Sequence, residues 1–263
     1  MRIAILGAGH MGSWLAQELL AEHQVAVYDK QAAPLGRLPH AVRVLSALSE
    51  IEIFKPDFLI NVVSLKNTVA VFQEAAPYLP KSAVICDMAS IKGKIADCYA
   101  SSGFKFVSAH PMFGPTFADM QKIKEENAVI IAESCEEGKK FFSQFFQQRG
   151  CRIFEYTFEE HDRMMAYSLA TPFVSSMIFA ACVDSKAVPG TTFKRHMDIA
   201  RHLLSEDDSL LAEILFNPYS IAELEKITRR LEFLKHIIRA KDQEEARGFF
   251  EKLRENIQEG AAS

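Results

Sequence analysis

A glycine-rich turn at the start of the chain constrains the fold more than any other feature. The apolar run Arg2–Leu6 is typical of a strand, and Gly7, Gly9 and Gly12 follow it in G-x-G-x-x-G spacing at the start of an amphipathic stretch. The first glycine permits a tight turn, the second lets a pyrophosphate approach the backbone, and the third lets the helix pack on the strand. Free N–H groups at the helix start can then hold phosphate. The pattern predicts a dinucleotide-binding unit, and a merely structural glycine turn is the alternative.

An acidic residue follows the next predicted strand. Asp29 lies 20 residues beyond Gly9, where a carboxylate can accept hydrogen bonds from both ribose hydroxyls of adenosine and repel a 2′-phosphate. This favours NAD over NADP, although Lys30 weakens the preference because a cation there could pair with the extra phosphate. The predicted cofactor-binding residues are Gly7, Gly9, His10, Met11, Gly12, Asp29 and Ser64.

The first half of the chain alternates short apolar runs with amphipathic stretches, which is typical of a parallel sheet flanked by helices. The predicted strands are Arg2–Leu6, Gln24–Tyr28, Ala41–Leu45, Phe58–Val63, Ala83–Asp87, Lys105–Ser108, Ala128–Ala132 and Cys151–Tyr156. The predicted helices are Met11–Glu22, Ala47–Ile53, Thr68–Tyr78, Lys92–Ala100 and Glu136–Gln148. We therefore predict an α/β fold whose N-terminal domain, residues 1–157, is a doubly wound, Rossmann-type parallel sheet.

The second half has apolar residues at helical spacing, with breaks at VPGT and NPYS. The predicted helical stretches are Glu159–Ser185, Thr192–Ser205, Glu206–Phe216, Ile221–Ala240 and Asp242–Glu259. We predict an all-helical substrate and dimerisation domain over residues 158–263. Its apolar stripe is expected to pack into the domain and a partner subunit, giving a homodimer, and a purely intrachain helical pair is the alternative. The stripe consists of Leu224, Ile227, Leu231, Leu234 and Ile238.

Charge and composition narrow the classes of partner. With 263 residues and a formal net charge of −4, the chain has no basic surplus to attract nucleic acid or an anionic membrane. Its five cysteines include no C-x-x-C pair, which indicates neither a disulfide framework nor a zinc site and fits a reducing cytoplasm. No apolar run reaches the roughly 20 residues of a membrane span, and the start MRIAIL does not resemble a signal peptide. We expect a cytoplasmic protein with a small-molecule substrate and no metal.

A histidine stands in the stretch FVSAHPMFGP, just after the sixth predicted strand. Ligands gather at the carboxyl ends of strands in an open parallel sheet, so His110 is expected to face the nicotinamide. A neutral imidazole there can accept a proton from an alcohol while hydride leaves the same carbon. Pro111, Gly114 and Pro115 are expected to fix the ring direction. The alternative is a histidine that only caps a turn.

The stretch CDMASIKGK ends the fifth predicted strand. Ser90 there can offer a hydroxyl to the substrate or to the nicotinamide amide. For Lys92, a solvent-facing position at a helix start and a functional role both stay open.

Five stretches together resemble the prephenate and arogenate dehydrogenases of tyrosine biosynthesis: GAGHMG, CDMASIK, SAHPMFGP, EEHDRMMAYSLATPF and LLAEILFNP. The resemblance covers nearly the whole chain. It implies oxidative decarboxylation of a cyclohexadienol, with His110 as the base for the hydroxyl proton and Ser90 as the serine that bonds the substrate hydroxyl and helps orient the cofactor. It predicts an NAD-dependent prephenate dehydrogenase that makes 4-hydroxyphenylpyruvate. Arogenate dehydrogenase is the close alternative.

The helical half departs from the family pattern at one substrate position. Many relatives carry a second histidine where this chain has Phe173, and Thr171 could supply a hydroxyl instead. His161 is expected to be structural, as a helix-start residue at the domain junction. The missing histidine leaves open a catalytically inactive, dinucleotide-sensing regulatory protein of the same fold, although the intact Ser90 and His110 count against it.

A substrate with two carboxylates needs a cation, preferably an arginine. The family takes it from the helix after a glycine-containing loop, which here reads GTTFKRHMDIARHLL. An ungapped match places the family's arginine at His202, and a one-residue shift places it at Arg201. We favour Arg201 because it is charged. Lys194 shares the helix face of Arg201. A solvated face is the alternative for these cations. Arg163 is a reserve candidate that is expected instead to bind across the domains.

Overall fold

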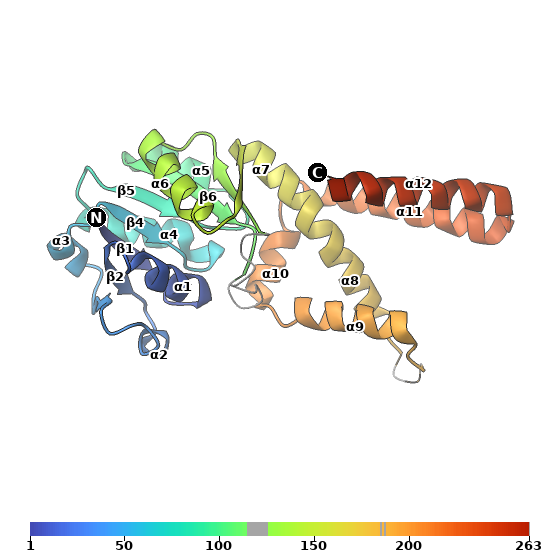
Figure 1. The fold of residues 1–263 in the computed structure, drawn as a ribbon, viewed down its shortest axis with the longest axis horizontal. Helices are drawn as coiled ribbons and strands as arrows, with labels where there is room; N and C mark the ends of the chain where they lie inside the picture. Colours follow the sequence, from blue (N-terminus) through green and yellow to red (C-terminus); the bar gives the residue numbers. More distant parts are fainter. Residues whose placement is uncertain (115–125, 185, 187, 263) are drawn as a thin grey trace.

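The first half of the protein is built around an eight-stranded sheet, and the helices of the second half extend from one side of it (Figure 1). The computed structural model describes residues 1–114, 126–184, 186 and 188–262. The strands are β1 Arg2–Leu6, β2 Gln24–Tyr28, β3 Arg43–Val44, β4 Phe58–Asn61, β5 Val84–Asp87, β6 Lys105–Pro111, β7 Asn127–Ile131 and β8 Arg152–Tyr156. They lie in the order β3-β2-β1-β4-β5-β6-β7-β8. Its first six positions are the Rossmann order, which confirms the predicted fold class.

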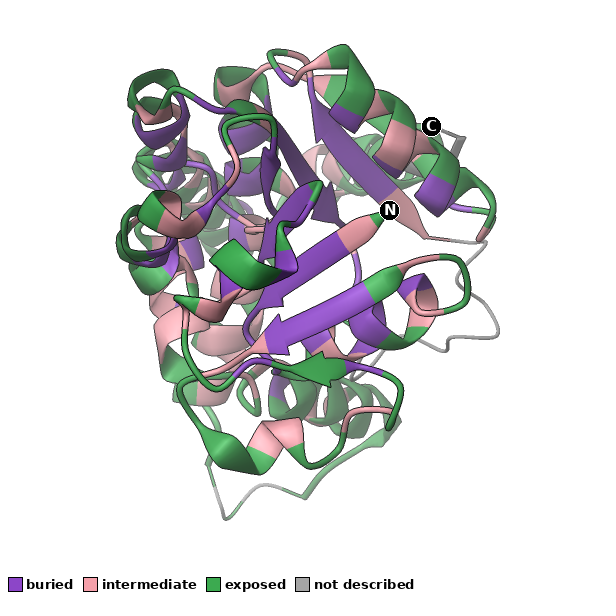
Figure 2. Cartoon of the chain, turned by 90° about the vertical axis from the view of Figure 1, so that its left-hand side faces the viewer, coloured by how far each residue is buried: buried purple, intermediate pink, exposed green. Residues whose placement is uncertain are grey.

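Helices cover both faces of this sheet, and each face has its own apolar core. The helices of the sheet half are α1 His10–Leu19, α2 Ala32–Leu35, α3 Glu50–Phe54, α4 Leu65–Ala75 followed by the 3₁₀ turn η1 Ala76–Tyr78, α5 Ile95–Ser102 and α6 Glu136–Gln147. The central strands are buried on both faces (Figure 2), as their continuous apolar runs require. The short helix α2 was not predicted from the sequence.

The sixth strand is longer than predicted. It continues through His110 to Pro111, because β7 pairs with its end antiparallel, with His110 opposite Val129 and Pro111 opposite Ala128. The prediction that His110 follows the strand is therefore wrong: sheet pairing fixes its backbone. Pro115, expected to frame the ring, lies outside the described residues.

The second half is helical, as predicted. Its elements are α7 Phe158–Met165, the π-helical turn η3 Ala166–Ala170, α8 Thr171–Ala181, α9 Thr191–Leu203, α10 Asp208–Leu215, α11 Ser220–Ala240 and α12 Gln243–Ala262. Ser185, the predicted end of the first helical stretch, lies outside the described residues. Helix α7 begins at a capping box, in which Thr157 Oγ1 accepts from Glu160 N (3.2 Å) and Glu160 Oε2 accepts from Thr157 N (2.8 Å).

The helical half leaves much of its apolar surface uncovered. Helices α11 and α12 run side by side away from the sheet (Figure 1), in contact through the rings of Phe233 and Phe249, 5.3 Å apart. Most of the predicted stripe nevertheless stays exposed: Leu224 at 39%, Leu231 at 45%, Leu234 at 36% and Ile238 at 64%. Within one chain, the stripe is therefore not packed into the domain.

The expectation that no apolar run is long enough for a membrane span is wrong. The helical run Phe158–Ala181 is long and apolar enough by length and composition, and 17% of its most apolar window is buried within the chain. A single helix of this kind is weak evidence, because core helices of other proteins meet the same criteria. The expectation that the protein has no membrane partner stays a prediction.

Candidate active site

A cleft of about 490 Å³ opens at the carboxyl ends of β1, β4, β5 and β6, where the helical half faces the sheet. The sheet half contributes His10, Met11, Ser64, Ser90 and His110 to its lining. The helical half contributes Leu169, Phe173, Glu206, Asp207 and Glu213. The structure thus brings both predicted catalytic residues and three predicted cofactor-binding residues to one cavity.

The glycine turn has the geometry that its sequence predicts. Gly7 has φ of +100°, and its N–H donates to Tyr28 O over 2.8 Å. A Cβ at Gly12 would overlap the Gly7 carbonyl, whereas a Cβ at Gly9 would meet nothing within 4 Å. The first hydrogen bond of α1 runs from Ser13 N to Gly9 O over 2.9 Å. The earlier N–H groups of the helix therefore have no intrahelical partner and can hold an anion beside the open side of Gly9.

Asp29 is fixed next to this turn. Its Oδ2 accepts from Ala8 N over 2.6 Å and its Oδ1 from Gln31 N over 2.8 Å. The neighbouring Lys30 extends toward α4, where its Nζ lies 3.5 Å from Glu74 Oε2. The carboxylate, and not the lysine, is therefore the charge held at the turn.

A chain of three side chains begins at the cleft and runs inward. His110 is 5% exposed, and its Nδ1 lies 3.0 Å from Nε2 of His161, a residue of α7. His161 Nδ1 in turn lies 2.9 Å from Asp162 Oδ1. Asp162 also accepts hydrogen bonds from the backbone N–H groups of Lys92 and Gly93, each over 2.8 Å. The first turn of α7 thus reaches across to the predicted base.

A buried ion pair supports the end of the sixth strand. The Lys92 Nζ lies 2.7 Å from Asp87 Oδ2 and 2.7 Å from the carbonyl oxygen of Ala109, and Tyr99 Oη donates to Asp87 Oδ1 over 2.7 Å. Both charged side chains are fully buried. Lys92 is therefore not solvent-facing: its cation links β5 to the residue before His110.

Burial keeps both histidines neutral. Burial, together with the neighbouring His161 and Lys92, holds the pKa of His110 well below its ordinary value. Burial also lowers the pKa of His161, although Asp162 opposes this shift. Burial alone would raise the pKa of Asp162, but the hydrogen bonds from His161, Lys92 N and Gly93 N outweigh it and leave that pKa lowered. Near neutral pH the site therefore holds two neutral imidazoles beside a carboxylate.

The predicted substrate-binding residues lie elsewhere in the single chain. Lys194, Arg201 and His202 are exposed on α9, away from the lining of the cleft, and Arg201 pairs with Asp198 over 2.9 Å. Thr171, half-buried at the start of α8, does not line it either. Phe173, two residues further, does line the cleft.

Arg163 does not bind across the two predicted domains. Its guanidinium contacts Glu159 over 2.7 Å and lies 4.9 Å from the ring centre of Tyr219, both in the helical half. His161, expected to be only structural, touches the predicted base instead, and Asp162 was not selected from the sequence. The only sequence signal for this contact was an adjacent His-Asp pair at a capped helix start.

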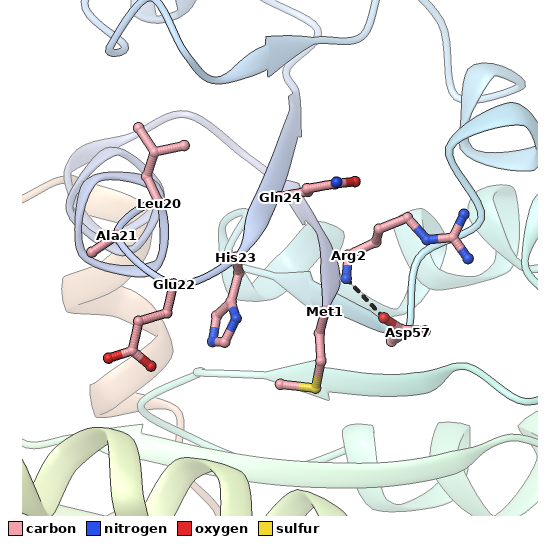
Figure 3. Close-up of a pocket in the computed structure, with 8 residues that line it drawn as sticks. All are labelled: Met1, Arg2, Leu20, Ala21, Glu22, His23, Gln24 and Asp57. Carbon is pink, nitrogen blue, oxygen red and sulfur yellow. Dashed lines mark hydrogen bonds between the residues drawn. The ribbon is translucent and has the colours of Figure 1, made fainter.

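A second cavity lies at the opposite edge of the sheet, by the start of β1 (Figure 3). Its lining includes Met1, Glu22 and His23, and the backbone N–H of Arg2 donates to Asp57 Oδ2 over 2.7 Å. It contains none of the predicted site residues. Because ligands of open parallel sheets bind at the carboxyl ends of the strands, this cavity is not a candidate active site.

Comparison with known proteins agrees with this geometry. The family model "Prephenate dehydrogenase, nucleotide-binding domain" matches residues 21–154, just over half of the chain. Among solved structures, prephenate dehydrogenase from Aquifex aeolicus has a TM-score of 0.83 at 18% identity and 98% coverage of both chains. Synechocystis arogenate dehydrogenase has a TM-score of 0.77 at 16% identity, covering 98% of this chain and 99% of that one.

Two curated relatives are similar in sequence. Arogenate dehydrogenase 2 of Arabidopsis thaliana, named as chloroplastic, is 23% identical over 89% of this chain and 69% of its own length. A probable arogenate/prephenate dehydrogenase of Methanocaldococcus jannaschii is 23% identical over 76% of this chain, which spans only 47% of that protein. The matched residues lie within the predicted nucleotide-binding domain, residues 1–157, whose bounds stay a prediction. This chain belongs to the prephenate dehydrogenase family of oxidoreductases.

Proposed function

We propose that this protein oxidises and decarboxylates a cyclohexadienol, converting prephenate to 4-hydroxyphenylpyruvate with NAD as hydride acceptor. One observation carries the proposal. A buried, neutral histidine and Ser90 line the same cleft as the residues that follow the glycine turn. Nε2 of His110 has no hydrogen-bond partner among the described residues, so it is the nitrogen left for a substrate.

The residues at the turn fit NAD. Gly9 leaves open space for a pyrophosphate, and the start of α1 supplies N–H groups. Asp29 would accept the ribose hydroxyls and repel a 2′-phosphate, while Lys30 is paired with Glu74. The Aquifex aeolicus prephenate dehydrogenase was solved with NAD+ bound.

The chemistry assigned to this chain is proton transfer and orientation. His110 Nε2 takes the proton of the ring hydroxyl as the carbon is oxidised. Bound NAD supplies the hydride acceptor. The ring carboxylate then leaves as carbon dioxide, and its bonding electrons complete the aromatic ring as a phenolate. The phenolate oxygen takes the proton back from His110 to give the phenol. Ser90 bonds the substrate hydroxyl and helps orient the nicotinamide amide.

Arogenate is the second candidate substrate, since it carries an amine where prephenate has a keto group. Three carboxylates line the cleft, Glu206, Asp207 and Glu213, and carboxylates attract an ammonium group. Curated relatives named arogenate dehydrogenase point the same way.

We also propose that two copies assemble through the helical half, residues 158–263, with residues 1–157 as the nucleotide-binding domain. The exposed stripe on α11 supports this, because apolar faces of this kind are typical of subunit interfaces. Arg201 is retained as the proposed partner of a substrate carboxylate, reaching a cleft in the assembled dimer. The cytoplasmic location stays a prediction, and both Arabidopsis relatives are named as chloroplastic.

Turnover of purified protein tests the function directly. The protein is mixed with NAD and either prephenate or arogenate, reduced cofactor is followed by absorbance, and the aromatic product is identified by chromatography. We expect 4-hydroxyphenylpyruvate from prephenate, and faster turnover of arogenate would establish the second candidate. Cofactor binding without turnover of either substrate would contradict the proposal and support the inactive sensor.

A further inference from the structure

The contact between His110 and His161 fixes where each ring carries its hydrogen. Asp162 is held as a carboxylate by three hydrogen bonds, from His161 Nδ1 and from the backbone N–H groups of Lys92 and Gly93. A carboxylate only accepts, so the hydrogen between these two side chains belongs to His161 Nδ1. In a neutral imidazole the other nitrogen is then an acceptor. His161 Nε2 therefore accepts, and His110 Nδ1 donates, across the 3.0 Å that separates them.

The support of this contact is rigid. His161 is fully buried and Asp162 nearly so. The carbonyl oxygen of Asp162 accepts from Asn217 Nδ2 over 2.8 Å, and the capping box at Thr157 fixes the start of α7. His110 is held from the other side by its place in β6, beside the Ala109 carbonyl that Lys92 binds. Rotation of the His110 ring would break its bond to His161, and rotation of the His161 ring would break that bond and the one to Asp162.

We propose that His161, held by Asp162, is a positioning residue that keeps His110 in the tautomer with its hydrogen on Nδ1. In the resting protein Nε2 is then the unprotonated nitrogen of a residue that lines the cleft. This inference rests on the proposed function for its catalytic consequence, but the tautomer itself is a property of the resting protein.

The arrangement also stabilises the protonated base. When His110 Nε2 gains the hydroxyl proton, its Nδ1–H stays bonded to His161, and His161 stays bonded to the Asp162 carboxylate. The new positive charge therefore lies at the head of a hydrogen-bonded chain that ends on a negative charge, which strengthens each bond in it. No other proton has to move.

The tautomer can be measured by NMR on full-length protein with ¹⁵N-labelled histidines. Correlations between ring carbon-bound protons and ring nitrogens distinguish a protonated from an unprotonated Nδ1, and the His110 signal is the one lost in His110→Asn. We expect His110 protonated on Nδ1 near neutral pH. Predominant protonation on Nε2 in the wild-type protein would overturn the proposal without need of any variant at His161.

Two variants then separate positioning from bulk structure. His161→Met removes the acceptor, and we expect a mixed His110 tautomer with kcat reduced roughly 10²-fold, less than the roughly 10⁴-fold loss of a fully wrong tautomer, at unchanged KM for substrate and NAD. His161→Gln restores an acceptor near the Nε2 position and should restore both the tautomer and most of kcat. His40→Met, at an exposed histidine of the sheet half, is the matched control and should change neither.

A His161→Met protein that keeps the wild-type tautomer and kcat would overturn the proposal. So would a His161→Gln protein as impaired as His161→Met. If the wild-type protein turns over neither substrate, the proposed function fails while the NMR result still decides the tautomer.

Discussion

The sheet half and the helical half of this protein use apolar residues in opposite ways. The strands and their covering helices bury nearly all of theirs in two cores, one on each face of the sheet. Beyond Ala170, the buried apolar side chains of the described chain are Ala200, Leu211, Ile214 and Ile237. The apolar side chains of the sheet half are mostly buried within one chain, whereas the helical half exposes apolar surface that a second subunit would cover in the proposed dimer.

The same contrast separates the predicted site residues. Those on the sheet half meet at one cleft, because parallel strands bring their carboxyl ends to one edge. Those on α9 (Figure 1) are not among the residues that line that cleft in the single chain.

The largest expected effect is on chemistry in the sheet half. His110→Asn should lower kcat by about 10² to 10⁴, the usual scale for losing a general base. The oligomeric mass should stay that of the parent, because the exposed stripe on α11 is untouched. Steady-state kinetics measure kcat, and sedimentation measures the oligomeric mass. A variant as fast as the parent would remove His110 from the mechanism.

Packing at the glycine turn should show the next largest effect. Gly12→Ala puts a Cβ into the Gly7 carbonyl, so we expect a loss of about 1 to 3 kcal/mol in the free energy of unfolding and weaker NAD binding. Gly9→Ala is the matched control, because its Cβ meets open protein surface; it should weaken NAD binding with little change in stability. Urea denaturation and calorimetric titration measure the two quantities. Equal stability losses in both variants would contradict this account of the turn.

The helical half is tested by charging its exposed stripe. Leu231→Glu combined with Leu234→Glu should convert a dimer of 29.5 kDa chains into monomers, because burying two carboxylates in an apolar interface is costly. Arg239→Glu, an exposed change on the same helix, should leave the dimer intact. Sedimentation velocity reports the mass. A wild-type protein that is already monomeric at micromolar concentration would contradict the dimer.

A smaller effect is expected at α9. Arg201→Gln should raise KM for the substrate roughly tenfold, which corresponds to about 1.4 kcal/mol of binding free energy, with kcat and NAD affinity nearly unchanged. Lys194→Gln on the same face is the comparison, and its effect should be smaller because lysine lacks the bidentate fork. An unchanged KM in Arg201→Gln would indicate that Arg201 and Lys194 only form a solvated face of α9 and do not bind the substrate.

The smallest effect concerns pH. The pKa values of His110 and His161 are lowered in the folded protein, so the unfolded chain binds their protons first. Stability should therefore be constant above about pH 6.5, the ordinary histidine value, and fall as the pH drops below it toward the folded pKa values. Activity should persist below pH 6.5 for the same reason. Chemical denaturation at several pH values, with His110→Asn as control, checks the slope.

The sequence was most informative where local chemistry dictates local structure. The glycine spacing, the apolar runs of the central strands and the helical periodicity after residue 157 each predicted the element that the structure contains. It could not predict contacts between distant segments: the antiparallel pairing of β7 that extends β6 through His110, the buried pair of Lys92 with Asp87, or the approach of His161 to His110 from 51 residues away in sequence. Such contacts depend on how helices and strands dock, and no spacing rule encodes them.

A crystal structure with NAD and a 4-hydroxyphenyl product analogue would place the proposed base against the reacting oxygen. We expect Nε2 of His110 to lie about 3 Å from the phenolic oxygen, on the side of the ring that faces the nicotinamide, with Nδ1 still bonded to His161. A His110 ring turned into packed protein, or a phenolic oxygen too far from Nε2 for a direct hydrogen bond, would contradict the assignment of the base.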